Sequence, residues 1–392
     1  MSERLIFHID VNSAYLSWTA AEQLKQGSSL DLRTIPSIIG GDMASRRGVV
    51  LAKSGPAKTY GIITGEPVAH ALQKCPNLHL ESPDHRLYSQ YSRRLMDLLI
   101  SFCPSIEQVS IDECYMDFTE NKHCYKNPRD AAVQIKDTVK ESLGFTVNIG
   151  ISTNKLLAKM ASDFQKPDKV HTLFPEEIPE KMWPLPVREL FMVGKASAAA
   201  LAKLEICTIG DLAHIDPQIL EQHMKSHGRL IWKFANGVDD SPVNTQESEL
   251  KCVGNSTTLA RNAQTAAEAK KTLHSLCRQV SSRLQNYGQY AGMVSTEIRY
   301  ASFVRVSHQM QLPSSTFDEQ ILCHHACLLF DELWNGEPVR LLGVHTSKLT
   351  DEPQPVQLNL FDLPKTQKEQ KAQQAAKALQ DKYGKNIIRK GF

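Results

Sequence analysis

Residues 5–12 read LIFHIDVN, and this stretch predicts how the first domain is built. Apolar side chains occupy both sets of alternating positions, which is the pattern of a buried β-strand inside a sheet. Asp10 stands near the end of this strand. Acidic residues are rarely buried in such places unless they are paired or bound to a metal. Asp10 is therefore the first candidate functional residue.

A second stretch, IEQVSIDECYMDFT at 106–119, predicts two short strands with Asp112 and Glu113 near the turn between them. If these strands neighbour the first one, the three carboxylates converge and need a cation to neutralise their repulsion. Oxygen ligands suit Mg²⁺, and two such ions can assist an in-line displacement. Solvated acids at strand ends are the alternative interpretation.

The segments around these strands predict an α+β domain. Helical spacing covers 84–103, a second helix begins after Asn127-Pro128, and strand 145–152 leads into helix 153–166. We expect these helices to pack against an antiparallel sheet. Lys58, in a Gly/Pro loop, could clamp a polyphosphate beside a metal–carboxylate cluster, as could Lys159, although each lysine alone is usually a solvated charge.

The rest of the chain predicts further domains. Residues 171–240 are helical in pattern, 241–249 are a polar linker, and strands return from 250 with a helix over 316–335. Residues 251–310 hold eight Lys and Arg against two Asp and Glu, which favours contact with a nucleic-acid backbone. After 351 the chain is rich in Gln and Lys.

Composition bounds these interpretations. A chain of 392 residues suggests two to four domains, and 41% hydrophobic with 22% charged residues is typical of a soluble globular protein. The formal net charge of +2 does not by itself indicate a nucleic-acid-binding protein, so such a function has to be inferred from local clusters of basic residues. No apolar run approaches the roughly 18 residues of a membrane span, and no signal peptide is evident, so we expect a cytoplasmic location without membrane contact.

The nine cysteines include no CxxC pair and suggest reduced thiols. The tightest cluster is Cys323-His324-His325-Ala326-Cys327, where zinc is conceivable. A helical apolar stripe runs through this segment, and no second ligand pair lies nearby in sequence. We therefore expect its cysteines to be small core residues.

Several motifs together resemble the Y-family translesion DNA polymerases. The runs IFHIDVNSAYLS (6–17), VSIDECYMDF (109–118) and GISTNKLLAKMASDFQKPD (150–168) are similar to the three palm motifs of that family. The fingers motif resembles 49–67, the thumb 186–213 and the end of the little finger 340–349. The similarity runs in order from about residue 5 to 361, and it is greatest to the bacterial DNA polymerase IV and V types.

The resemblance implies an α+β multidomain, right-hand polymerase fold with a ferredoxin-like palm, small fingers, a helix-hairpin-helix thumb and an α+β little finger. The implied domains are the palm at 1–14 and 83–170, fingers at 15–82, thumb at 171–240, linker at 241–249, little finger at 250–350 and tail at 351–392. The implied activity is template-directed transfer of a nucleotide from a dNTP to a primer 3′-hydroxyl, in low-fidelity translesion synthesis and DNA repair without proofreading.

The resemblance also implies roles for individual residues. Asp10, Asp112, Glu113 and the backbone carbonyl of Val11 match the ligands of two Mg²⁺ ions. Tyr15 matches the steric gate that rejects a 2′-hydroxyl. Lys58 and Lys159 are the residues expected to contact the nucleotide. The residues expected to contact DNA are Gly194, Lys195, Lys251, Arg299 and Arg305.

Three positions depart from the family pattern. Gly55 and Lys58 stand where many relatives have Tyr and Arg, and Met192 stands where a small residue is usual. Lysine cannot give the bidentate grip of arginine on a phosphate, so we expect weaker nucleotide binding than in those relatives.

The tail contains Gln357-Leu358-Asn359-Leu360-Phe361, which resembles the sliding-clamp peptide of bacterial polymerases. Exposed Leu360 and Phe361 in a polar tail require a partner or a place to pack, so packing on the chain's own little finger is the alternative. The expected partners are primer–template DNA, dNTP and the clamp, with the protein a nucleoid-associated monomer.

Two other functions are open to this sequence. A non-catalytic DNA- and clamp-binding accessory protein could keep the fold, but it would be expected to have lost a carboxylate. A nucleotide cyclase could share the palm, but it would have no use for the hairpin thumb, the basic segment or the clamp peptide.

Overall fold

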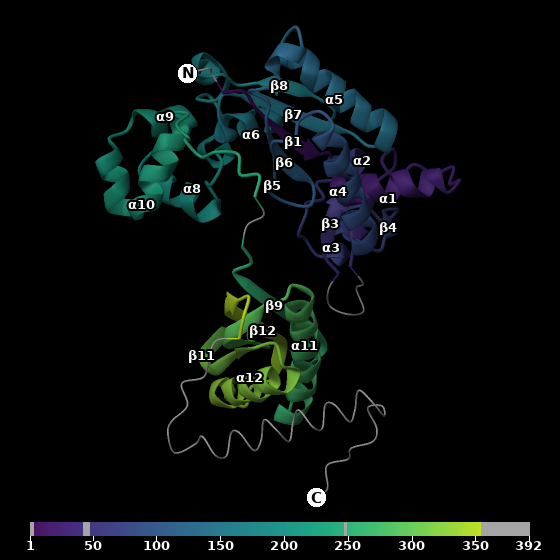
Figure 1. Cartoon of the computed structure of the whole chain (residues 1–392), viewed down its shortest axis with the longest axis vertical. Coiled ribbons are helices and arrows are strands. Elements are labelled where there is room, and N and C mark those ends of the chain that lie inside the picture. The colour runs from purple at the N-terminus through teal and green to yellow at the C-terminus, as the bar shows by residue number, and fades with distance from the viewer. Residues whose placement is uncertain (1–3, 42–47, 247–248, 354–392) are drawn as a thin grey trace, which may run out of the picture. The chain divides into compact units, whose positions relative to one another are not determined.

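The computed structural model describes residues 4–41, 48–246 and 249–353, and the chain separates into two compact units between residues 248 and 249 (Figure 1). That division falls inside the polar linker expected at 241–249. Each unit is described by itself. The description covers all the predicted site residues except the four of the clamp peptide.

The first unit is built on a five-stranded sheet with the order β5-β6-β1-β7-β8. Its strands are β1 Ile6–Val11, β5 Ile106–Gln108, β6 Glu113–Asp117, β7 Val147–Ser152 and β8 Val170–Thr172. The expectation of an antiparallel sheet is wrong at one edge, because β8 runs parallel to β7. The chain reaches β8 through helix α6, and a crossover of this kind returns the chain in the same direction.

Helices cover both faces of this sheet. The larger core lies under α1 Ala14–Lys25, α4 His85–Ile100 and α5 Pro128–Leu143, and it receives Phe7, Ile9 and Val11 from β1. Helix α6 Lys155–Asp163 packs on the opposite face. Because side chains alternate along a strand, His8 and Asp10 face α6.

A short segment between β6 and α5, η1 Lys122–Cys124, is a 3-10 turn. The predicted caps of α5 are confirmed: the Asn127 side chain accepts a hydrogen bond from the Asp130 amide, and Gly144 ends the helix with φ 78°.

A small sheet of order β3-β2-β4 lies within the expected fingers segment. Its strands are β2 Ser37–Gly40, β3 Val50–Lys53 and β4 His79–Glu81, with helices α2 Gly55–Thr59 and α3 Val68–Lys74. Ser54 caps α2, because its hydroxyl accepts a hydrogen bond from the Ala57 amide at 3.1 Å. The cap fixes the start of the helix that carries Lys58.

The helical segment that follows β8 has its own core. Its elements are η2 Pro175–Glu177, α7 Ile178–Lys181, η3 Val187–Glu189, α8 Lys195–Ala202, α9 Ile209–His214 and α10 Pro217–Ala235. Leu190 and Val193 are buried there, so the turn between η3 and α8 is anchored while Met192 remains exposed.

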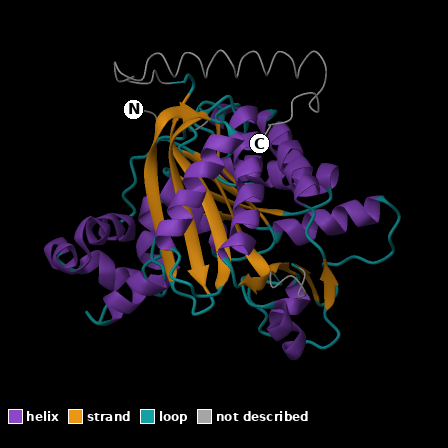
Figure 2. Cartoon of the chain, turned by 90° about the horizontal axis from the view of Figure 1, so that it is seen from below, coloured by secondary structure: helices purple, strands orange, loops and turns teal. Residues whose placement is uncertain are grey.

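The second unit is an antiparallel sheet of order β11-β10-β12-β9 with two helices on one face. Its strands are β9 Cys252–Ala263, β10 Tyr290–Tyr300, β11 Arg305–Thr316 and β12 Val339–Thr350. Its helices are α11 Ala266–Asn286 and α12 Glu319–Leu333. Figure 2 shows helices lying across the face of the long strands.

The sequence analysis did not predict α11. The signal was present, since Ala269, Leu273, Leu276, Val280 and Leu284 recur at helical spacing and are all buried. The many polar residues between them obscured the stripe.

Candidate active site

Strand pairing brings the three predicted carboxylates together. Asp10 of β1 is directly opposite Glu113 of β6, so the two side chains leave the sheet on the same face. The Val11 amide donates a hydrogen bond to the Asp112 carbonyl at 3.0 Å, which holds the turn before β6 against the end of β1. Residues about a hundred positions apart therefore meet where β1 ends and β6 begins.

A cleft of about 570 Å³ opens beside the end of β1 and the turn before β6. Its walls come from the end of β1, the start of α1, the β3–α2 segment and the turn before β6. The residues that line it are Asp10, Val11, Ser13, Ala14, Tyr15, Leu51, Ala52, Lys53, Lys58, Thr64, Asp112 and Lys166. The cleft thus places two carboxylates opposite lysines, which suits an anionic ligand that carries a divalent cation.

Asp10 is half-buried at the end of β1. Burial raises the pKa of its carboxyl group above the ordinary value, and the Lys166 ammonium, which forms an ion pair with it, acts in the opposite direction. Asp112 is fixed by the Ser110 hydroxyl, which donates a hydrogen bond to Oδ1 at 2.6 Å. A half-buried acid beside a second carboxylate is a donor set that fits a hard divalent cation.

Glu113 is held by two nitrogen-bearing side chains. Its Oε2 lies 3.3 Å from His8 Nε2, an ion-pair distance without regular hydrogen-bond geometry, and accepts a hydrogen bond from Lys159 Nζ at 2.7 Å. The contact with His8, followed by that with Lys159, lowers the pKa of Glu113 to about 2 although desolvation opposes this. Burial lowers the pKa of His8, whose Nδ1 pairs with Ser162 Oγ at 2.8 Å. Glu113 is therefore an ionised carboxylate at neutral pH.

Lys159 stands next to the carboxylates, and its ammonium is committed to Glu113 in this structure. It does not line the cleft with Lys58. The predicted nucleotide-binding lysines thus lie on two sides of the site: Lys58 on α2, and Lys159 on α6 beneath Glu113.

Tyr15 forms part of the cleft wall. Its ring stacks on Tyr88 with centroids 4.3 Å apart and 6° between the planes, and His85 meets it edge-on at 6.0 Å. Both contacts come from α4, a helix of the rigid core. The ring is therefore fixed in orientation, as a steric gate requires.

Gly55 begins α2, and an added Cβ there would meet no atom within 4 Å. The open space is consistent with a site where many relatives carry a larger residue. Lys58 is exposed one turn later, while the neighbouring Lys53 donates to the Ile62 carbonyl at 2.7 Å and lines the same cleft.

The predicted DNA-contacting residues are distributed over both units. Gly194 precedes the first residue of α8, Lys195 is exposed, and Met192 adopts a left-handed φ of 70°. Left-handed backbone suits glycine, which explains the small residue usual there. Arg299 and Arg305 stand opposite each other on the sheet face away from α11 and α12, and Lys251 is exposed before β9.

Four of the eight basic side chains of 251–310 are paired with acids. Arg261, Lys270, Arg278 and Arg305 form ion pairs with Glu268, Asp331, Glu319 and Glu297, respectively. Two of these acids belong to α12, outside the counted window. The open sheet face is therefore less basic than the sequence count suggested.

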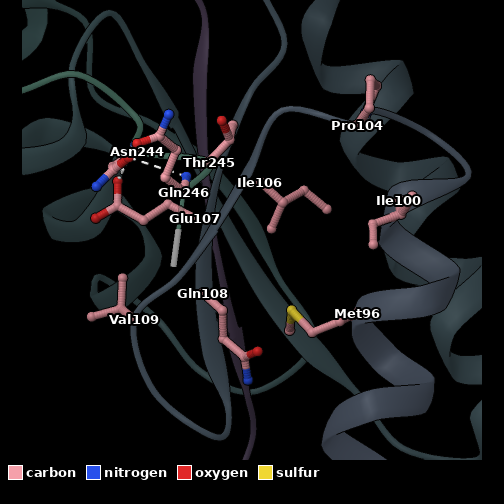
Figure 3. Close-up of a pocket in the computed structure, with 10 residues that line it drawn as sticks. All are labelled: Met96, Ile100, Pro104, Ile106, Glu107, Gln108, Val109, Asn244, Thr245 and Gln246. Atoms are coloured by element: carbon pink, nitrogen blue, oxygen red, sulfur yellow. Dashed lines mark hydrogen bonds between the residues drawn. The ribbon is translucent and has the colours of Figure 1, made fainter. Parts of the chain in front are cut away.

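The linker is attached to the first unit beside β5. The Asn244 amide donates to Glu107 Oε2 at 2.7 Å, and the same carboxylate accepts from Lys155 Nζ at 2.7 Å. Figure 3 shows Glu107 and Asn244 among the residues of a neighbouring pocket of about 480 Å³, which also contains Met96 and Ile106. Lys155, one turn before Lys159, thus has a positioning role here.

His8, Lys53 and Lys166 complete the site, and the sequence analysis did not assign them a role. Lys166 lies in the 150–168 motif before Pro167 and could have been found there as a third cation. His8 lies two positions before Asp10 on the predicted strand, so the alternation of side chains could have placed both on the same face of the sheet. The clamp residues Gln357, Leu358, Leu360 and Phe361 lie outside the described residues.

Comparison with known proteins shows which family the chain resembles. The impB/mucB/samB family model matches residues 9–163, and the model of that family's C-terminal domain matches 250–360. DNA polymerase IV of Clostridium acetobutylicum is 46% identical over 385 residues, spanning 98% of this chain and 97% of that protein. The chain belongs to the Y family of DNA polymerases. DNA polymerase IV of Bacillus velezensis is 35% identical over 390 residues, spanning 99% and 92% of the two chains.

The fold of this Y-family polymerase has a solved counterpart. A chimaera of the Y-family DNA polymerases Dbh and Dpo4 matches with a TM-score of 0.79 and 21% identity, over 89% of this chain and all of the other. The expected right-hand fold is confirmed. Y-family enzymes generally depend on divalent metals and act on DNA and nucleotides. Among the described residues, no helix is long and apolar enough to cross a membrane.

Proposed function

We propose that Asp10, Asp112 and Glu113 are the catalytic carboxylates with which this Y-family polymerase performs template-directed DNA synthesis across damaged templates. The observation that carries the proposal is the register of β1 against β6, which opposes Asp10 to Glu113 and brings Asp112 to the same cleft. We infer low fidelity without proofreading, in translesion synthesis and DNA repair.

The donor set favours two Mg²⁺ ions, held by the three carboxylates and the Val11 carbonyl. Such ions would supply Lewis acidity to the attacking and leaving oxygens. The chain's own contribution is positional: Lys166 and Lys159 pair with Asp10 and Glu113 and balance their negative charge. Tyr15 would bound the sugar side and Lys58 would face the phosphates, which Lys159 would reach by leaving Glu113. These roles make the cleft a site for a dNTP opposite a primer terminus.

Primer extension with Mg²⁺ and dNTPs, on an undamaged and an abasic template, tests the function. We expect extension on both templates, and none when a chelator removes the metal. A protein that binds primer–template DNA in a mobility-shift assay but extends neither primer, with or without a sliding clamp, would instead be the non-catalytic accessory.

Tyr15→Ala is expected to admit ribonucleotides. The stacked ring closes the space next to the sugar, and steric discrimination of one small group is worth roughly 10- to 200-fold in kcat/KM. We therefore expect the dNTP/rNTP selectivity to fall by about that factor. Tyr15→Phe keeps the ring and is the control. Unchanged dNTP/rNTP selectivity in Tyr15→Ala would show that Tyr15 is not the steric gate.

Lys58→Arg is expected to improve nucleotide binding. Lys58 lines the cleft from α2, and arginine can bind a phosphate through two parallel hydrogen bonds where lysine offers a point charge. We expect the KM for dNTP to fall by about threefold to tenfold at unchanged kcat. A KM that does not fall in steady-state extension counts against the phosphate role.

We infer that Gly194 and Lys195 approach the DNA backbone from the helical thumb, while Lys251, Arg299 and Arg305 do so from the little finger. The first amides of α8 have no side-chain cap and are free for a phosphate, and both arginines lie on a helix-free sheet face. Such contacts give binding that weakens as salt rises.

The clamp peptide supports a further proposal, that the tail recruits a sliding clamp to a monomeric, cytoplasmic and nucleoid-associated enzyme. Replacing both Leu360 and Phe361 with Ala is expected to abolish clamp-stimulated synthesis and to leave clamp-independent synthesis intact, because these side chains would fill an apolar groove. Replacing Lys365 and Lys368 with Ala is the control in the same tail. Stimulation that survives the Leu360/Phe361 replacement would rule out this peptide as the docking segment.

A further inference from the structure

Three soft-metal ligands meet where α11 packs against α12 in the second unit, and a fourth thiol lies beside one of them. His274 Nδ1 lies 3.0 Å from Cys323 Sγ, and the ligand atoms of His274, Cys323 and Cys327 all lie within 4.8 Å of one another. Cys277 Sγ also interacts with Cys323 from the buried side. The four residues come from only two helices.

Helical periodicity explains how the cluster forms. His274 and Cys277 are three residues apart on α11, and Cys323 and Cys327 are four apart on α12, so each pair occupies one face of its helix. Both faces point into the contact between the helices. The second ligand pair that the sequence lacked near Cys323 is therefore supplied by the helix that was not predicted.

Burial is graded across the cluster. Cys277 and Cys323 are buried, Cys327 is half-buried and His274 is exposed. The expected core placement of Cys323 is confirmed, but a plain core explains neither the contact with an imidazole nor three thiols in one place. A metal can enter from the His274 side, and the buried thiols would hold it away from solvent.

The neighbouring charges are compatible with thiolates. Lys270 and Asp331 form an ion pair of 2.6 Å one turn beyond His274 and Cys327, so an ammonium and a carboxylate lie beside the cluster and offset each other. Zinc binds cysteine as the thiolate, so binding must release the thiol protons. A divalent cation would displace those protons and take the thiolates as ligands.

We propose that His274, Cys323 and Cys327, with Cys277 as the fourth ligand, bind one Zn²⁺ ion that fastens α11 to α12. Sulfur and imidazole donors in a tetrahedral set select zinc over the Mg²⁺ of the carboxylate site. With Zn–S near 2.3 Å and Zn–N near 2.0 Å, ligand atoms stand roughly 3.5 to 3.8 Å apart. The ligand atoms of His274, Cys323 and Cys327 lie within 4.8 Å of one another and need only small side-chain rotations, whereas Cys277 must turn toward them from its contact with Cys323.

The experiment measures metal in the full, untagged chain, purified under a non-chelating reductant. We expect about one zinc per chain by elemental analysis, and Co²⁺ substitution should give a thiolate-to-cobalt charge-transfer band with tetrahedral ligand-field bands. Removing zinc with a chelator should lower the unfolding temperature of the second unit, since a ligand that binds only the folded state stabilises it.

Cys327→Ser and His274→Ala should each weaken zinc binding at least about 100-fold in competition with a chromophoric chelator. His324→Ala and Cys252→Ser are matched controls, because both residues are exposed and lie outside the cluster, and they should bind as the wild type does. Far-UV circular dichroism checks that the variants fold.

Three results would overturn the proposal. The first is a chain that takes up neither zinc nor cobalt at micromolar concentration. The second is equal affinity in the cluster variants and the controls. The third is a mass loss of two hydrogens under mild oxidation with no metal uptake under reductant, which would make the cluster a dithiol–disulfide pair.

Discussion

Asp112→Asn is expected to abolish primer extension, with a loss of at least about 10³-fold in kcat, or roughly 4 kcal/mol of transition-state stabilisation. The substitution removes one negative charge from the cleft and keeps the shape of the side chain. Asn Oδ1 can still accept the hydrogen bond that the Ser110 hydroxyl now donates to Asp112. The loss should therefore come from chemistry and not from folding.

The measurement is single-turnover extension at saturating dNTP and DNA, with DNA affinity and the unfolding temperature measured in parallel. Asp137→Asn is the matched control, because Asp137 is an exposed acid on α5 whose loss changes net charge equally. Extension by Asp112→Asn within tenfold of the wild type, at equal DNA affinity, would show that this carboxylate is not catalytic.

Gly150→Ala is expected to destabilise the first unit by more than about 3 kcal/mol. A Cβ at Gly150 would lie 1.9 Å from the Ala158 carbonyl oxygen and 2.5 Å from the Ser162 amide nitrogen. Both atoms belong to the backbone of α6 and cannot rotate away. The helix must then move off β7, which separates Lys159 from Glu113 and Ser162 from His8.

Thermal unfolding of the full chain tests this, read from the transition of the first unit because two units do not unfold as one. We expect that transition to fall by at least about 6 °C, with extension reduced as well. Gly55→Ala is the control, since nothing lies within 4 Å of its added Cβ, and it should leave stability equal or slightly higher. Equal unfolding temperatures for both variants would mean that α6 does not pack this closely on β7.

The predicted strands and most helices followed from local patterns. Alternation over 5–12, the caps at Asn127 and Gly144, and the spacing of α4 all report on near neighbours in the chain. Helix α11 was not predicted for a related reason: a long helix with a narrow apolar stripe and many polar residues gives only a weak local pattern. The parallel edge strand β8 was missed because strand direction depends on the crossover.

The candidate site was only partly predictable. Asp10, Asp112 and Glu113 were found as acids at strand ends, but the cations that balance them were not placed. Lys166 reaches Asp10 across 156 positions, and Lys159 is drawn to Glu113 and away from the cleft. The count over 251–310 also did not include the acids of α12, which pair with Lys270 and Arg278.

The family followed from the sequence, and the sequence also predicted the order of the domains and three candidate catalytic carboxylates, because these depend on residue types and their order along the chain. Which groups share an environment depended on the folded arrangement of the chain. Strand register set Asp10 opposite Glu113, the missing Cβ of Gly150 let α6 approach, and the packing of α11 on α12 joined a histidine to three cysteines. Charge balance and metal coordination depend on distance in space, which chain order does not contain.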